Sequence, residues 1–192
     1  MGHVVRRSGI VLLAAQLLFM AAGVSCAESS WQKLNDRSVE LFNQRRYAEA
    51  AEMAEKAVRI AEGELGPNDP LVAASLSNVA AIYKAQARYK EAEGLLKRAV
   101  NIFERDQKNP DQAMSLVPLH MLAWLYETQG RYADAQPLLR KALGIAETRI
   151  PSDDPWVARL LVDYANTIRN LGEPQAAHSL EARAKGIREK QR

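Results

Sequence analysis

The stretch LSNVAAIYKAQARYKEAEGLLKRAV, from Leu76 to Val100, recurs 43 residues later as LHMLAWLYETQGRYADAQPLLRKAL, from Leu119 to Leu143. Leucine, alanine and tyrosine stand at matching positions in the two copies. An earlier copy begins at Leu34, and a looser copy continues the register from Leu161. Self-similarity at a period of roughly 20–50 residues is typical of repeat arrays, so this stretch decides the fold.

Each copy predicts two helices. Leu76, Val79, Ala80 and Tyr83 have the spacing i, i+3, i+4, i+7, which places them on one helical face. Residues 92–99 repeat that spacing on a second helix, with alanine at both ends of the pattern. Because alanine side chains are small, the two helices can approach closely. Each copy therefore predicts one helical hairpin.

A recurring arginine–tyrosine–alanine cluster marks the turn of the hairpin. The cluster reads RRYAEA at residues 45–50, ARYKEA at 87–92 and GRYADA at 130–135. We interpret it as the joint of the hairpin, in which the tyrosine and the alanines close the turn and the arginines face water. Gly130 and Gly172 stand where the C-terminus of a helix favours a left-handed residue.

The loops between hairpins carry helix-start signals. Asp69–Pro70 and Asp154–Pro155 each predict an acidic N-cap followed by proline in the first turn. Pro137 lies near a helix start and is expected to be tolerated, whereas Pro118 is expected to kink or delay its helix. The predicted units cover residues 31–66, 70–107, 112–150 and 154–190, within a repeat domain at 28–192.

Residues 1–27 predict a cleavable export signal. Two arginines precede an apolar stretch at residues 10–22, and small side chains follow it. Cleavage after Ala27 is one reading, and lipidation of Cys26 is another, because AAGVSC resembles the bacterial lipoprotein box. An uncleaved anchor is the third, because residues 8–27 lack charge and could span a bilayer. We expect an exported protein, either periplasmic or an outer-membrane lipoprotein.

Composition excludes several classes of function. The chain has 26 basic and 23 acidic residues, and removing residues 1–27 takes away two arginines and no acid, which leaves a net charge of +1. Net charge therefore gives no reason to expect a nucleic-acid partner. Cys26 is the only cysteine, which excludes a disulfide framework. His120 and His178 lie in separate units and are interpreted as ordinary helix residues, and we predict no catalytic residue, metal or cofactor.

The pattern Leu-x3-Ala-x2-Tyr, followed by Gly-x-Tyr-x2-Ala-x3-Leu-x2-Ala, resembles the tetratricopeptide repeat (TPR). The 42-residue period, the GPNDP loop and EAEGLLKRAV are similar to the longer repeats of kinesin light chains and their bacterial relatives. The resemblance covers residues 31–190 and is weakest in the fourth unit, where Ile168 replaces tyrosine. It implies an all-α fold, a right-handed superhelical solenoid of four helical hairpins.

The resemblance also implies a concave groove, formed by the first helix of each unit, that binds an extended peptide or a partner helix. We expect Trp124 to anchor the partner or, alternatively, to cover the neighbouring repeat, and Trp156 to be structural. Lys84 and Arg169 lie two units apart, so a paired clamp for a terminal carboxylate is not expected. The groove positions carried over from the family are Asn35, Phe42, Asn43, Ser77, Lys84, His120, Trp124, Glu127, Asn166, Arg169 and Asn170.

These features together predict a non-catalytic, exported adaptor whose partner is a protein or a peptide. Contact with a membrane is expected only through an N-terminal lipid or an uncleaved anchor. The alternative is a lipid-anchored assembly factor, modified on Cys26, that localises a cell-envelope machine.

Overall fold

The computed structural model describes residues 29–105 and 112–191 of the chain. The regular structure within these ranges is helical, without a β-strand. None of the helices described there is long and apolar enough to cross a membrane. The predicted export signal and Cys26 lie outside the described residues.

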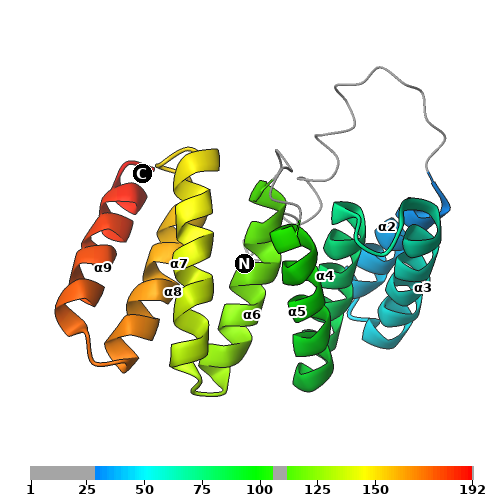
Figure 1. Cartoon of the computed structure of the whole chain (residues 1–192), viewed down its shortest axis with the longest axis horizontal. Helices are drawn as coiled ribbons and strands as arrows, with labels where there is room; N and C mark the ends of the chain where they lie inside the picture. Colours follow the sequence, from blue (N-terminus) through cyan, green and yellow to red (C-terminus); the bar gives the residue numbers. More distant parts are fainter. Residues whose placement is uncertain (1–28, 106–111, 192) are drawn as a thin grey trace, which may run out of the picture.

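Four helical hairpins follow one another along the chain, and we call them units one to four (Figure 1). The first helix of each unit is its A-helix and the second is its B-helix. A short 3-10 helix, η2 (Gln112–Ser115), precedes the third unit. The predicted all-α solenoid is thereby confirmed. The A/B pairs are α2 (Ser30–Asn43) with α3 (Tyr47–Leu65), α4 (Pro70–Ala85) with α5 (Tyr89–Arg105), α6 (Leu116–Thr128) with α7 (Tyr132–Arg149), and α8 (Pro155–Asn170) with α9 (Pro174–Glu189).

The helix starts follow the signals in the loops. The Asp69 carboxylate accepts a hydrogen bond from the Leu71 amide at 2.8 Å, and Asp154 accepts one from the Trp156 amide at 2.7 Å. Each cap satisfies an amide of the first helical turn, which has no partner within the helix. The predicted N-caps of α4 and α8 are therefore confirmed.

The two prolines behave differently. The α-helix of the third unit begins only at Leu116, after the 3-10 turn η2, so its start is delayed, and Pro118 lies buried in its first turn. An amide in the first turn has no helical acceptor, so proline at that position removes no hydrogen bond. Pro137 lies inside α7, which continues through it to Arg149.

Small buried side chains form the seam between the two helices of each hairpin. Ala80 on α4 faces a B-helix whose Ala92 and Ala99 are also completely buried. Leu96 and Leu139 fill the space beside this seam in units two and three. Two buried alanines recur at matching positions of the B-helix in every unit, so each hairpin closes over the same small side chains. The buried alanines of the B-helices are Ala50, Ala51, Ala54, Ala57, Ala61, Ala92, Ala99, Ala135, Ala142, Ala146, Ala177 and Ala184.

The arginine of each joint is tied to the turn. Arg88 forms an ion pair with Glu91 at 2.5 Å and donates a hydrogen bond to Gln86 at 3.1 Å. Its guanidinium also lies 3.7 Å from the centre of the Tyr83 ring. Arg46 and Arg131 repeat the bonds to a glutamine two residues before and an acid three residues after.

Our interpretation of the joint therefore needs two corrections. The arginines are partly exposed, as predicted, but they also bridge the turn rather than simply facing water. The tyrosine stacked at the turn comes from the A-helix: Tyr126 is 6% exposed and lies under Arg131 at 4.1 Å. Tyr89 of the joint itself, the first residue of α5, is 42% exposed.

Consecutive B-helices are joined by a ladder of ion pairs that was not predicted. Arg98 pairs with Glu62 at 2.5 Å, Lys141 with Glu104 at 2.8 Å, and Arg183 with Glu147 at 2.7 Å. The acids and the bases each recur at the repeat period. Such largely exposed pairs contribute only about 0–1 kcal/mol each, so apolar burial provides most of the stability between units.

Both ends of the array carry charges where inner units bury apolar side chains. Arg37 and Glu40 of α2 are exposed, whereas Val79 and Ile82, 42 residues later in α4, are buried against unit one. At the other end, Glu181, Lys185 and Arg188 of α9 replace three buried residues of α7, namely Leu139, Leu143 and Ala146. The outer faces therefore favour water, as a terminal repeat requires.

The turn within each hairpin contains one residue with a positive φ. These residues are Arg45 (62°), Ala87 (59°), Gly130 (72°) and Gly172 (90°), which occupy the same position in successive units. A side chain with a Cβ is disfavoured in this left-handed region, whereas glycine is not. The turn geometry is therefore conserved between units even where glycine is absent.

We predict that Gly130→Ala lowers the free energy of unfolding by about 1 kcal/mol, because alanine disfavours a positive φ. Nothing lies within 4 Å of the added Cβ, so the loss reports backbone strain alone. The matched control is Gly94→Ala, inside α5 and equally free of neighbours, which should stabilise by roughly 0.5–1 kcal/mol. Thermal unfolding of both variants measures the difference, and shifts of the same sign would contradict the prediction.

Candidate functional site

The A-helices α2, α4, α6 and α8 carry all the positions predicted to bind a partner, and we call the surface they form the A-helix face. Polar contacts cross it from one unit to the next. In the first of these, Asn78 on α4 donates a hydrogen bond from its side-chain amide to Asn35 Oδ1 on α2 at 2.9 Å. Asn35 is therefore held by the next unit and is only partly accessible.

The contact between α6 and α8 is built on a carboxylate. Asp163 Oδ2 lies 2.7 Å from His120 Nε2 and 2.8 Å from Arg159 Nε. The side chains of Asp163 and His120 are each 13% exposed. Burial acts to raise the pKa of Asp163, but the hydrogen bonds and charges of His120 and Arg159 outweigh it, and the pKa lies below its ordinary value. The Trp156 and His120 rings pack edge to face, with their centres 4.9 Å apart.

Glu127 forms a second contact between α6 and α8. Thr167, which is completely buried on α8, donates its hydroxyl to Glu127 Oε1 at 2.6 Å. Burial raises the pKa of Glu127 above its ordinary value, and the nearby negative charge of Asp163 adds to the increase. The two carboxylates therefore differ: Asp163 is stabilised as an anion, whereas Glu127 is more readily protonated.

The contact between α4 and α6 involves a lysine and aromatic rings. Lys84 Nζ lies 4.1 Å from the centre of the Trp124 ring, and the Tyr89 ring lies 6.4 Å from the same tryptophan, tilted by 59°. Burial lowers the pKa of Lys84, and the positive charge of Arg159 lowers it further. Trp124 therefore contacts the preceding unit, yet it is only partly buried.

The remaining predicted positions divide by accessibility. Asn43 is exposed at the end of α2, and Phe42 packs against Tyr47 with ring centres 5.4 Å apart. The exposed positions of the fourth unit bond to one another: Asn170 donates to the Asn166 carbonyl at 2.8 Å, and Arg169 donates to the Asn166 side chain at 3.3 Å and pairs with Glu181 at 2.6 Å.

Ser77 requires a correction. Its side chain is 2% exposed, and its hydroxyl donates to the Ala73 carbonyl one turn earlier at 2.9 Å. The α4 helix is buried on most of its circumference, because it lies between unit one and the A-helix of unit three. Ser77 therefore offers no hydroxyl to a partner.

The sequence analysis missed several residues of the face. It interpreted His120 as an ordinary helix residue and included it among the groove positions, but it did not predict the contact with Asp163, 43 residues further on in the next unit. Asn35 and Asn78 have the same separation of 43 residues. A search for complementary polar pairs at one repeat period plus one residue would have found both. The missed residues are Asn78, Arg159, Asp163 and Thr167, and the contact of Tyr89, on the B-helix α5, with Trp124 was not predicted either.

The A-helix face offers amides, a lysine and aromatic rings, all of which suit non-covalent contact with a polypeptide. Within residues 29–105 and 112–191, no group of three or more His, Cys, Asp or Glu side chains is placed to hold a metal ion.

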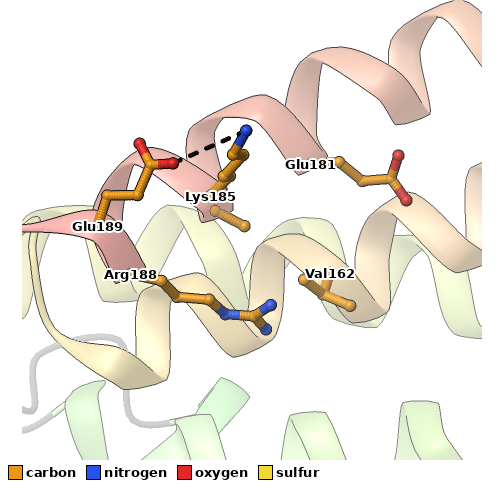
Figure 2. Close-up of a pocket in the computed structure, with 6 residues that line it drawn as sticks. Val162, Glu181, Lys185, Arg188 and Glu189 are labelled. Carbon is orange, nitrogen blue, oxygen red and sulfur yellow. Dashed lines mark ion pairs between the residues drawn. The ribbon is translucent and has the colours of Figure 1, made fainter. Parts of the chain in front are cut away.

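A separate cavity of about 480 Å³ lies at the outer end of unit four (Figure 2). Val162 of α8 and Ala184 of α9 are apolar, and the other lining residues are charged. Lys185 and Glu189 are paired across one helical turn at 3.7 Å. The cavity lies where a following unit would pack, and its charged lining belongs to the terminal face described above.

Comparison with known proteins identifies the family. Two models of the tetratricopeptide repeat match the chain, one at residues 38–105 and the other at residues 119–155. The chain therefore belongs to the tetratricopeptide repeat family, as the pattern of leucine, alanine and tyrosine predicted. Members of this family are generally non-catalytic scaffolds for protein–protein interaction. No curated protein sequence matched the chain.

Solved structures share the fold at low sequence identity. BtubC (BKLC) from P. vanneervenii has a TM-score of 0.75 and 22% identity, over 93% of this chain and 72% of that one. A putative kinesin light chain from Podospora anserina, with nearly identical TPR-like repeats, has a TM-score of 0.66 and 23% identity, over 95% and 87%. YrrB, described as a TPR protein with an unusual peptide-binding site, has a TM-score of 0.60 and 16% identity, over 84% and 76%.

We predict that Asp163→Asn lowers the free energy of unfolding by about 2 kcal/mol at pH 7, because it removes a buried charge that holds two hydrogen-bond donors. The pKa of Asp163 is lowered in the folded chain. Its carboxylate therefore adds to the free energy of unfolding above the ordinary aspartate pKa, and this addition is lost as the pH falls through the lowered value. Thermal unfolding from pH 7 to pH 3 should show the two proteins converging.

The exposed Asp153→Asn variant is the control and should match the unsubstituted chain at both pH values. A loss in Asp163→Asn that is independent of pH would show that the carboxylate charge does not contribute.

We also predict that Lys84 loses its proton at a lower pH than Lys97. Burial and Arg159 lower the pKa of Lys84, whereas a hydrogen bond to Glu93 raises that of Lys97. NMR titration of the lysine side chains measures both. Trp124→Ala should move the Lys84 value back towards that of an exposed lysine, and an unchanged value would show that the ring does not desolvate the amine.

Proposed function

We propose that this chain is a non-catalytic interaction scaffold that binds a peptide or a partner helix on its A-helix face. The observation that carries the proposal is the position of Trp124, which is partly buried on that face and contacts Lys84 and the Tyr89 ring of the preceding unit. A rigid aromatic side chain that still reaches solvent is the kind of residue that dominates binding energy at protein interfaces.

The polar part of the face supports the same proposal. Asn43 and Asn166 are exposed, and an amide side chain can both donate to and accept from a peptide backbone. The contacts between units, such as His120 with Asp163, fix the A-helices relative to one another. A face organised before binding loses less entropy on association than a flexible one.

We further propose that the scaffold is exported, on the strength of the signal at residues 1–27. The alternative is a lipid-anchored assembly factor, and the AAGVSC sequence ending at Cys26 is the observation in its favour. The mass of the mature N-terminus separates the two: a free Glu28 supports a periplasmic scaffold, and a lipid-modified Cys26 supports the anchored form. A chain that keeps residues 1–27 unmodified would contradict both.

We expect Trp124→Ala to weaken binding of peptides selected from a phage-displayed library on the full chain by about 30-fold or more, since truncating an interface hot spot costs ~2 kcal/mol or more. Fluorescence anisotropy with labelled peptides measures the change. Leu171→Ala is the control, because Leu171 is 37% exposed at the α8–α9 turn, outside the A-helix face. Selected peptides that bind Trp124→Ala unchanged would contradict the proposed binding face.

A further inference from the structure

We infer that Lys84 makes the A-helix face selective for acidic peptides, by pairing with the carboxylate of an aspartate or glutamate side chain in the bound partner. This inference rests on the proposed function and specifies the chemistry of the ligand. The observation behind it is that Lys84 contacts an aromatic ring, whereas the other partly buried lysine and arginine side chains in the described residues each pair with a carboxylate.

Partly buried cations elsewhere in the structure are neutralised. Lys56 pairs with Glu52 at 2.7 Å, Arg88 with Glu91 at 2.5 Å, and Arg98 with Glu62 at 2.5 Å. Lys84 has no carboxylate within ion-pair distance among residues 29–105 and 112–191, and its contact is the Trp124 ring. It is therefore the one partly buried lysine or arginine in these ranges whose charge lacks an acidic partner.

The nearby charges do not replace that partner. Arg159 repels Lys84, and the carboxylate closest to Arg159 is Asp163, which already accepts from both Arg159 and His120. Glu127 accepts from Thr167. Asp163 and Glu127 are thus used in contacts between α6 and α8. No carboxylate of residues 29–105 or 112–191 neutralises Lys84, and a bound molecule can supply one.

Burial makes such a contact favourable. An ion pair between exposed side chains is weak because water screens it, but Lys84 is already partly desolvated by its neighbours. Folding has therefore already removed part of the water around the Lys84 amine. An incoming carboxylate interacts more strongly with this amine than with that of an exposed lysine. The Trp124 and Tyr89 rings supply an apolar surface for the residues beside the acid.

The experiment uses a phage-displayed library of random dodecapeptides, selected in parallel on the full chain and on its Lys84→Met, Lys84→Arg and Lys97→Met variants. Selection on the unsubstituted chain should enrich aspartate and glutamate about threefold or more over the starting library. Lys84→Arg should retain the enrichment because the charge remains, and Lys84→Met should lose it. Lys97→Met should retain it, because that lysine is exposed on α5 and paired with Glu93.

A selected peptide is then synthesised with its acid and with the matching amide. The change from acid to amide should weaken binding to the unsubstituted chain about tenfold, as expected for a hydrogen bond to a charged group, and should leave binding to Lys84→Met unchanged. Circular dichroism checks that Lys84→Met is folded. If it is not, the Lys84→Gln variant takes its place.

The outcomes separate this inference from the proposed function. Peptides that need Trp124 but show no enrichment of acids would overturn the inference and leave the scaffold function intact. Equal enrichment on Lys84→Met would overturn it as well, because another cation would then select the acid. Failure to select any peptide that depends on Trp124 would contradict the proposed function together with the inference.

Discussion

The close approach of two helices over buried alanines is the constraint on which the rest of the structure depends. Ala80 and Ala92 are completely buried at this seam, and a larger side chain at either position would separate the hairpin. The separation of the helices fixes the turn, and the turn requires a residue with positive φ and an arginine that bridges it. Each unit then presents the same two faces to its neighbours.

Local signals made the hairpins predictable from the sequence, whereas contacts between units were not. The caps at Asp69 and Asp154 depend on two or three neighbouring residues, so their spacing in the sequence determines them. His120 and Asp163 meet only because one A-helix packs on the next with an offset of one residue beyond the repeat period. Ser77 was misplaced for a related reason, since its burial depends on the units on both sides of α4.

The A-helix face distributes its polar groups unevenly, and this bears on where a ligand can gain energy. Between α6 and α8, the acids are satisfied by His120, Arg159 and Thr167, so these groups stabilise the scaffold. Between α4 and α6, the contact is a lysine on a tryptophan ring. An ammonium group that contacts only an aromatic ring can still form an ion pair with a carboxylate. A carboxylate that already accepts from two donors has few acceptor sites left for a ligand. The contacts between α6 and α8 thus stabilise the scaffold, whereas the contact between α4 and α6 leaves a charge that a ligand can pair with.

The charges at the two ends of the array have a consequence for its behaviour at high concentration. A solenoid whose last unit resembled its inner units would offer a surface that fits the first unit of another molecule, and such head-to-tail contacts do not close. Glu181, Lys185 and Arg188 at one end, and Arg37 and Glu40 at the other, would have to lose their water in that contact. The charges on both faces therefore disfavour head-to-tail contacts between molecules.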